Sequence, residues 1–106
     1  MVKYIKNLDE FNKDVLELSK TKLVVVDFTA TWCGPCQFIA PVFEKMAQDY
    51  PDVEFVKVDV DDANDVSSKC GIRSMPTFQF YKGGQKVDDF SGADKDVLEK
   101  KVKSLM

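Results

Sequence analysis

The hydrophobic residues of this chain form short β-branched runs that are separated by stretches with helical spacing. A nearly continuous apolar run at residues 23–28, Leu-Val-Val-Val-Asp-Phe, is typical of a central strand that is covered on both faces. Shorter runs predict strands at residues 2–5 and 53–58, and two more at residues 77–81 and 86–90. The chain is therefore expected to build a sheet around residues 23–28.

Apolar residues at helical spacing predict four helices between and after these strands. Asn7 with Glu10 three residues later is a capping pair that opens the first, and Gly71 is a natural end for the third. Pro41 falls inside the second helix, where the missing N–H should bend it. The second helix has its apolar pattern at Phe38, Ile39, Val42, Phe43, Met46 and Ala47. The expected ranges are residues 7–19, Cys36 to about Asp49, Asp61 or Asp62 to Gly71, and about Asp94 onward.

The order of these elements predicts an α/β fold with a mixed sheet. The first part of the chain alternates strands and helices, which favours parallel strands. Gly83-Gly84 then separates two strands directly, which predicts a hairpin and so an antiparallel edge. With 106 residues and no linker or repeat, we expect one domain, residues 1–106.

Composition narrows the function more than it narrows the fold. The formal charge is −3, without a dominant block of either sign, so we expect no nucleic-acid partner. No stretch approaches the roughly 18 apolar residues that a membrane helix needs, and the first residues lack the apolar core of a signal peptide. The expected location is therefore cytoplasmic. Thiols are kept reduced there, so a close cysteine pair needs a chemical reason.

Cys33 and Cys36 are that pair, and they fall where the central strand gives way to a helix. Residues three apart in a first helical turn lie on one face, within the distance that a disulfide requires. A helix N-terminus stabilises a thiolate, so the pKa of Cys33 should be lowered and Cys33 should be the nucleophile. Pro35 suits this first turn and stiffens the loop between the two sulfurs.

Half of a zinc site is the structural alternative for Cys33 and Cys36. Zinc would need two further ligands, and the chain has no histidine and only one other cysteine, Cys70. A site of three thiolates and one carboxylate is uncommon, so the spacing and the missing ligands favour redox chemistry without a cofactor.

The run from Val26 to Cys36, with Trp32-Cys33-Gly34-Pro35-Cys36 at its end, resembles the active-site segment of the thioredoxin family. Met75-Pro76-Thr77, Gly83-Gly84 and Ser91-Gly92-Ala93 recur at thioredoxin-like intervals, so the likeness covers nearly the whole chain. It implies a five-stranded mixed β-sheet flanked by four α-helices. Thr29, where bacterial members often carry a tryptophan, places the resemblance with the animal branch.

The resemblance implies protein-disulfide reductase activity. Cys33 would attack a substrate disulfide, and Cys36 would resolve the mixed disulfide, leaving a Cys33–Cys36 disulfide and a reduced product. Two alternatives remain open, a disulfide oxidase or isomerase and a redox-regulated binding module. Gly34-Pro35 favours a reductant, because isomerases typically carry a histidine between the cysteines.

The resemblance also assigns supporting roles. Pro76 would be a cis-proline beside the sulfurs, and Asp27 would exchange a proton with Cys36 near Lys57 on the neighbouring strand. A polar residue in an apolar strand is buried with a raised pKa, although Asp27 could instead cap backbone groups near the strand end.

The expected docking patch for substrates surrounds the cysteine pair. Its residues would be Trp32, Pro35, Met75, Gly92 and Ala93, with the backbone of Met75 pairing with an extended substrate peptide. By likeness to animal members, Asp61 would accept a hydrogen bond from the Trp32 indole.

The resemblance implies two kinds of protein partner for a monomer. Substrates would be disulfide-bearing proteins such as peroxiredoxins or ribonucleotide reductase, and an NADPH-dependent thioredoxin reductase would regenerate the dithiol. Cys70 follows Val66 and Ala63 at helical spacing, which favours a packed structural cysteine over a regulatory one. Ser74 stands where some animal members carry a dimerising cysteine, so no such dimer is expected.

Overall fold

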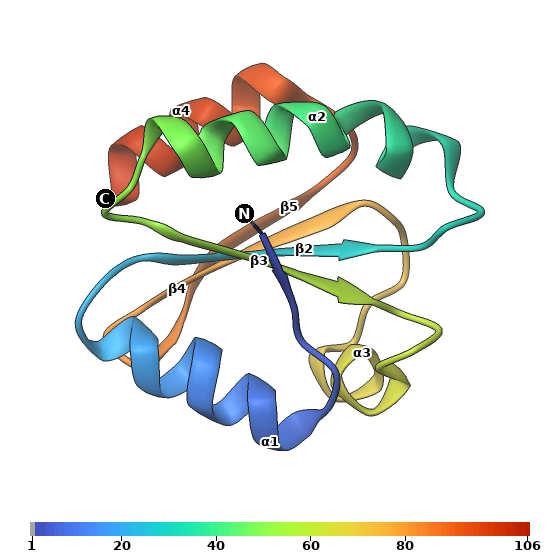
Figure 1. Cartoon of the computed structure of the whole chain (residues 1–106), viewed down its shortest axis with the longest axis horizontal. Helices are drawn as coiled ribbons and strands as arrows, with labels where there is room; N and C mark the ends of the chain where they lie inside the picture. The colour runs from blue at the N-terminus through green and yellow to red at the C-terminus, as the bar shows by residue number, and fades with distance from the viewer. Residues whose placement is uncertain (1) are drawn as a thin grey trace.

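The structure is a computed structural model of the chain, and it describes residues 2–106. Strands and helices alternate in the first two thirds, and a hairpin and a helix follow (Figure 1). In chain order the elements are β1 (Lys3–Tyr4), α1 (Leu8–Phe11), a π-helical segment η1 (Asn12–Glu17), a 3-10 turn η2 (Leu18–Lys20), β2 (Val24–Thr29), α2 (Gly34–Asp49), β3 (Glu54–Asp59), α3 (Asn64–Cys70), β4 (Thr77–Lys82), β5 (Gln85–Ser91) and α4 (Lys95–Leu105).

One five-stranded mixed sheet forms the centre of the molecule, in the order β1-β3-β2-β4-β5. β1 and β2 run parallel to β3, whereas β4 is antiparallel to β2 and β5 is antiparallel to β4. All six residues of β2 are buried, as its apolar run predicts for the central strand. The predicted fold, with its parallel core and antiparallel edge, is confirmed.

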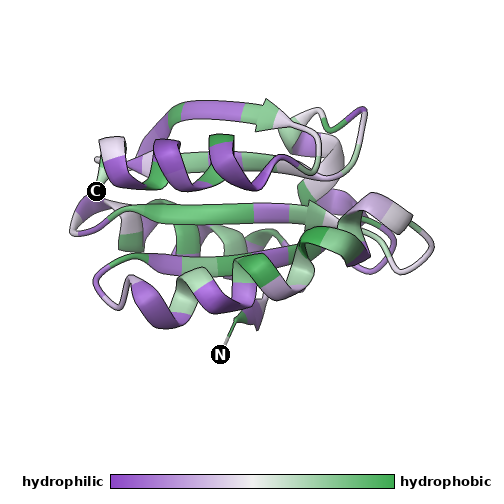
Figure 2. Cartoon of the chain, turned by 90° about the horizontal axis from the view of Figure 1, so that it is seen from above, coloured by the Kyte–Doolittle hydropathy of each residue, from purple (hydrophilic) through white to green (hydrophobic). Residues whose placement is uncertain are grey.

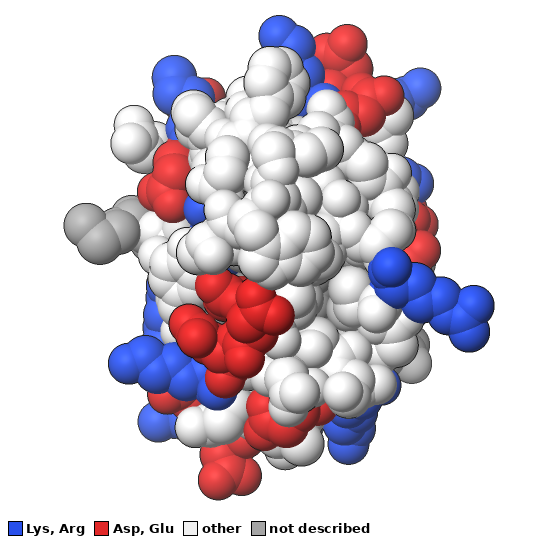
Figure 3. Space-filling model, turned by 90° about the vertical axis from the view of Figure 1, so that its right-hand side faces the viewer, with Lys and Arg blue, Asp and Glu red and all other residues white. Residues whose placement is uncertain are grey.

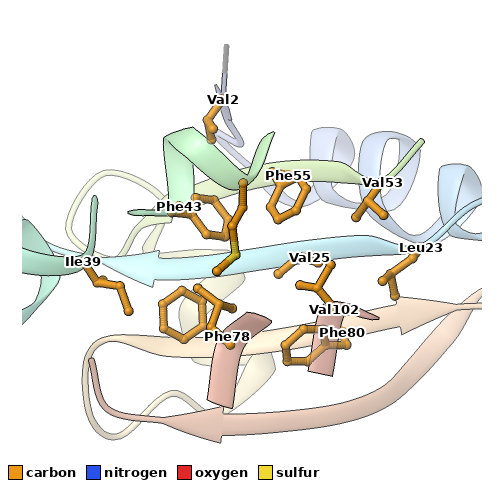
Figure 4. Packing of buried hydrophobic residues seen from close by; sticks show 12 residues of the cluster. Val2, Leu23, Val25, Ile39, Phe43, Val53, Phe55, Phe78, Phe80 and Val102 are labelled. Carbon is orange, nitrogen blue, oxygen red and sulfur yellow. The ribbon is translucent and has the colours of Figure 1, made fainter. Parts of the chain in front are cut away.

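Helices cover both faces of the sheet, α2 and α4 on one and α1 and α3 on the other (Figure 1). Each helix turns its apolar side to the strands, which gives the alternation of hydrophilic and hydrophobic residues along the helices in Figure 2. The core beneath α2 and α4 includes tilted and edge-on phenylalanine rings, such as Phe43 against Phe55 and Phe78 (Figure 4). Within residues 2–106, no helix is long and apolar enough to cross a membrane.

The first helix departs from the prediction of one regular helix over residues 7–19. α1 is a single α-helical turn, and the chain then continues as η1 and η2. The predicted cap is present, since the Asn7 side chain accepts a hydrogen bond from the Glu10 backbone N–H at 2.9 Å. Phe11 and Val15 are still buried in the core. Apolar residues four apart face the same side in an α-helix and in a π-helical segment alike. The spacing therefore predicts the buried side of this segment but not its helix type.

The start of α3 corrects a second prediction, the cap at Asp61 or Asp62. The helix begins at Asn64 with Ala63 as its N-cap, and no side chain among residues 2–106 caps it. The Asp59 carboxylate instead accepts the backbone N–H groups of Asp61 and Asp62, at 2.9 and 3.3 Å. Residues 61 and 62, which were expected to begin the helix, therefore belong to a turn after β3, and the helix begins at Asn64.

Candidate active site

Cys33 and Cys36 lie at the carboxyl end of the central strand, in the first turn of α2. They form a disulfide, and their Cα atoms are 5.2 Å apart, inside the usual window for such a bond. Cys33 is the N-cap of α2, and its Sγ accepts a hydrogen bond from the Cys36 backbone N–H at 3.2 Å. Pro35 occupies the first turn, where its missing N–H removes no helical hydrogen bond.

The two sulfur-bearing residues differ in access. Cys33 is 7% exposed and Cys36 is 1% exposed, so Cys33 is the one that an incoming group can reach. The Cys33 Sγ also lies 3.8 Å from the backbone oxygen of Met75. Val60 and Met75 pack against the pair, and sequence reasoning missed Val60 because nothing in its spacing links it to the site.

The loop that carries the pair is fixed by the carbonyl group of Ala30. This carbonyl accepts the Cys33 backbone N–H at 3.2 Å and the Gln37 side-chain amide at 3.0 Å. Gln37 is a second residue that sequence reasoning missed, since an exposed glutamine on a helix carries no recognisable signal. Its contact ties the first turn of α2 back to the end of β2.

The Met75–Pro76 peptide bond is cis, as the resemblance implied. The Pro76 carbonyl accepts the backbone N–H of Gly92 at 2.9 Å, which ties the start of β4 to the residues after β5. Gly92 has a φ of 108°, a conformation that favours glycine. Met75 is half-buried, and Ala93 is partly buried against the core below α2 and α4.

Trp32 lies directly before the pair and is 67% exposed. Its indole N–H donates a hydrogen bond to the Asp61 carboxylate at 2.8 Å, as expected from the animal members. Figure 3 views this end of the molecule, and a broad area without charged side chains lies between acidic groups and scattered lysine or arginine side chains. The exposed Trp32 ring gives this end of the molecule an apolar side chain that is suited to contact with a protein.

Asp27 lies in β2 and is fully buried, with no hydrogen-bond partner for either carboxylate oxygen among the described residues. The alternative that it caps backbone groups is therefore wrong. Burial raises the pKa of Asp27 to about 7, and the Lys57 ammonium group opposes this rise. Lys57 is the register partner of Asp27 on β3, so its predicted place on the neighbouring strand is confirmed.

Lys57 has two neighbours that sequence reasoning missed. Its Nζ lies 3.9 Å from the Glu44 Oε2 on α2 and 5.9 Å from the centre of the Tyr4 ring on β1. Tyr4 is also the register partner of Lys57. These contacts join side chains from three different elements, so no local pattern could have predicted them.

Cys70 lies away from the pair, at the last position of α3. It is half-buried against the core between the sheet and α1 and α3, and its Sγ is 3.9 Å from the Tyr81 hydroxyl. Burial raises the pKa of the Cys70 thiol, which disfavours its reactive thiolate form. This environment agrees with the preference for a packed cysteine.

No group of three or more histidine, cysteine or acidic residues within 2–106 is arranged to hold a metal ion. The described site combines a dithiol–disulfide pair, a buried carboxyl group and an exposed indole. Such a pair can exchange a disulfide with another molecule, with protons supplied or taken up nearby.

Comparisons with known proteins agree with this geometry. The family model described as thioredoxin matches residues 2–104. The thioredoxin of Ictalurus punctatus is 59% identical over 104 residues, which cover 96% of each chain. The thioredoxin of Homo sapiens is 51% identical over 106 residues, the full length of both.

Solved structures show the same similarity in three dimensions. The X-ray structure of Fasciola hepatica thioredoxin matches with a TM-score of 0.94 and 39% identity, over 99% of this chain and all of the other. Reduced Schistosoma mansoni thioredoxin matches with a TM-score of 0.91 and 44% identity, over 99% of this chain and 98% of the other. The likeness therefore extends across the whole fold and includes the region of the cysteine pair.

Proposed function

The chain belongs to the thioredoxin family and is a thiol–disulfide oxidoreductase, and on this premise we propose how its residues reduce disulfides in other proteins. The observation that carries the proposal is the pairing of Cys33 and Cys36 at the start of α2. The pair stores two electrons as a dithiol and gives them up when it becomes a disulfide.

Cys33 is the proposed nucleophile. Its Sγ accepts the Cys36 N–H at a helix N-terminus, an arrangement that stabilises a thiolate, and it is the more accessible of the two cysteines. The thiolate attacks one sulfur of the substrate disulfide and forms a new S–S bond. The substrate S–S bond breaks, and its second sulfur leaves as a thiolate.

Cys36 is the proposed resolving cysteine, and Asp27 the group that takes its proton. The Cys36 sulfur attacks the Cys33 sulfur, which re-forms the Cys33–Cys36 disulfide and releases the substrate as a dithiol. A carboxyl group with a pKa of about 7 can accept a proton at neutral pH and return it later. Lys57, beside Asp27, is its proposed supporting residue.

Substrates are proposed to dock on the exposed area around the pair. Trp32 is proposed to supply the largest apolar contact, and Gly92 and Ala93 are proposed to border the docking area. The backbone of Met75 is proposed to pair with an extended substrate segment, with Pro76 fixing that backbone next to the Cys33 sulfur. Gly34 and Pro35 keep the turn between the cysteines compact.

The proposed partners follow from this chemistry. Disulfide-bearing proteins accept the electrons, and a separate NADPH-dependent thioredoxin reductase restores the dithiol. Peroxiredoxins and ribonucleotide reductase are proposed as substrates on family likeness alone. The reaction suits a compartment where thiols are kept reduced, and we propose the cytoplasm.

A trapping experiment tests the assignment of the two cysteines. Cys36→Ser removes the resolving thiol, so a disulfide-bearing protein such as insulin should accumulate as a covalent adduct on Cys33. Mass spectrometry would detect the adduct, and reduction should release it. Cys33→Ser is the matched variant and should give no adduct at this site, while Cys70→Ser should reduce insulin at the normal rate. Equal adducts on Cys33→Ser would overturn the assignment.

A further inference from the structure

The buried Asp27 carboxylate lacks a partner even though a lysine lies beside it in the sheet. Both of its oxygens are buried, and neither has a hydrogen-bond partner among residues 2–106. Asp27 and Lys57 are register partners on adjacent parallel strands, so their side chains share the face that α2 covers. An ammonium group in this place would be expected to pair with the buried carboxylate.

Lys57 instead contacts two other groups. Its ammonium lies 3.9 Å from the Glu44 carboxylate, which belongs to α2, and 5.9 Å from the centre of the Tyr4 ring, which belongs to β1. The Lys57 side chain itself is buried, so water screens this attraction less than it would on an open surface. Glu44 and Asp27 are therefore alternative carboxylates for one ammonium group.

The two carboxylates differ in their exposure to water. The Glu44 side chain is 43% exposed, whereas Asp27 is fully buried, so desolvation disfavours the ionised form of Asp27. Glu44 is the carboxylate that lies within ion-pair distance of Lys57, at 3.9 Å. The ammonium is then drawn toward the surface of the molecule.

We propose that Glu44 is a positioning residue of the active site, whose carboxylate holds the Lys57 ammonium away from Asp27 and leaves the Asp27 carboxyl group unpaired. This inference rests on the proposed role of Asp27 as the proton acceptor for Cys36. Glu44 touches neither the substrate nor the sulfurs, and it acts only through Lys57 and through its own charge.

The direction of the effect follows from the charged groups around Asp27. α2 contributes Glu44, and its Cys36 is held in the disulfide; β3 contributes Lys57 and the more distant Asp59, and β1 contributes the Tyr4 phenol. β4 places Phe78, which is uncharged, in register with Asp27. Lys57 is the cation in this set, and its charge lowers the pKa of Asp27. Releasing Lys57 from Glu44 should therefore lower that pKa further, and the loss of a nearby negative charge acts in the same direction.

The test measures the Asp27 carboxyl group directly. The oxidised protein is labelled with ¹³Cγ-aspartate and titrated by NMR, because the disulfide removes the Cys36 thiol from the titration. Glu44→Gln should lower the pKa of Asp27 by about half a unit. An unchanged pKa in this variant overturns the proposal.

Glu54→Gln is the matched control. Glu54 also lies 3.9 Å from a lysine, Lys22, with a similar side-chain exposure of 39%, but it is three register positions away from Lys57 on β3. Removing it deletes the same charge and the same kind of ion pair, and it should leave the pKa of Asp27 nearly unchanged. A shift equal to that of Glu44→Gln would show a general charge effect and overturn the proposal.

A double variant tests whether Glu44 acts through Lys57. In a Lys57→Met background, Glu44→Gln should shift the pKa of Asp27 much less than it does in the native chain. An equal shift in both backgrounds overturns the positioning role.

The pH dependence of insulin reduction by Glu44→Gln separates this inference from the proposed function. If the pKa of Asp27 falls and the pH profile of the rate shifts to lower pH with it, the positioning role of Glu44 and the proton-accepting role of Asp27 are both supported. If the pKa falls and the profile does not move, Glu44 keeps its positioning role, while the proton-accepting role of Asp27 fails.

Discussion

Asp27 is a single residue of the central strand whose burial is unfavourable for the stability of the fold. The side chain is fully buried without a hydrogen-bond partner among the described residues, and burial raises its pKa to about 7. The neighbouring positions of β2 are apolar and contribute to the core. A carboxyl group in this place is a local conflict between stability and function, as is common at active sites.

The stability of the protein should therefore depend on pH through Asp27. Its folded pKa lies above the unfolded value of about 4, so the stability that it contributes is complete below about pH 4 and is lost as the pH rises through 7. The side-chain amide of an Asp27→Asn variant does not titrate. At pH 8 the free energy of unfolding of this variant should thus exceed that of the native chain by up to about 4 kcal/mol, and its urea midpoint should be higher. Near pH 4 the two should differ little.

Urea denaturation at both pH values measures this effect. Asp52→Asn is the control, because it makes the same substitution at an exposed position. A gain in stability from Asp27→Asn that is the same at pH 4 and pH 8 would contradict the assigned titration.

Asp61 should orient the Trp32 indole at the surface. The hydrogen bond of 2.8 Å between them is exposed, and such bonds contribute roughly 1 kcal/mol. Asp61→Ala should therefore reduce kcat/KM for insulin by about two- to fivefold, mainly through KM. Trp32 is the only tryptophan of the chain, so its fluorescence anisotropy should also fall as the indole gains motion. Asp62→Ala removes an adjacent charge and should leave both readouts unchanged; an equal effect from it would argue against the hydrogen bond.

At the scale of elements, α2 combines two tasks. Its first turn holds the cysteine pair, and its later turns bind the sheet through Ile39, Phe43 and Met46. The helix continues through Pro41 without interruption. Phe38 belongs to the apolar pattern that predicted this helix, yet it is 73% exposed, because the helix turns it away from the strands.

Phe43 and Phe38 provide a matched test of this packing. Phe43 is fully buried, and its ring centroid lies 5.3 Å from that of Phe55 and 5.8 Å from that of Phe78. Phe43→Ala should lower the free energy of unfolding by about 3 to 5 kcal/mol. Phe38→Ala, on the exposed side of the same helix, should change it by less than about 0.5 kcal/mol. Similar losses in urea denaturation would mean that the two sides of α2 are misassigned.

At the scale of the whole molecule, the sheet order places the site at the end of the central strand. β2 has a strand on either side and helices over both faces, whereas β1 spans two residues at one edge and β5 is the other edge. The cysteine pair lies just after β2, so its position is set by the central, fully buried strand rather than by an edge strand.

Hydrogen exchange should reveal this gradient. The backbone N–H groups of residues 24–29 should exchange most slowly, near the rate set by global unfolding, and those of β1 should exchange much faster. Exchange followed by NMR in the oxidised protein measures both. Protection of β5 that equals that of β2 would contradict the assigned order of stability.

The sequence by itself determined the order of the elements, the central place of residues 23–28, the hairpin and the cysteine pair. These features are local, because β-branched runs, turn glycines and a Cys-x-x-Cys spacing each act over a few neighbouring residues. The cis bond before Pro76 and the contact between Trp32 and Asp61 were predicted too, but only through the family resemblance.

Only the tertiary structure decided the helix type after Phe11, the start of α3 and the surroundings of Lys57. The helix type and the helix start depend on which of the competing hydrogen bonds form once the segments pack. The surroundings of Lys57 depend on Tyr4, Glu44 and Asp27, which belong to three different elements. Contacts between residues far apart in the chain carry no local pattern. The chemistry of the cysteines could therefore be predicted from the sequence, whereas the charges that set the proton chemistry around Asp27 could not.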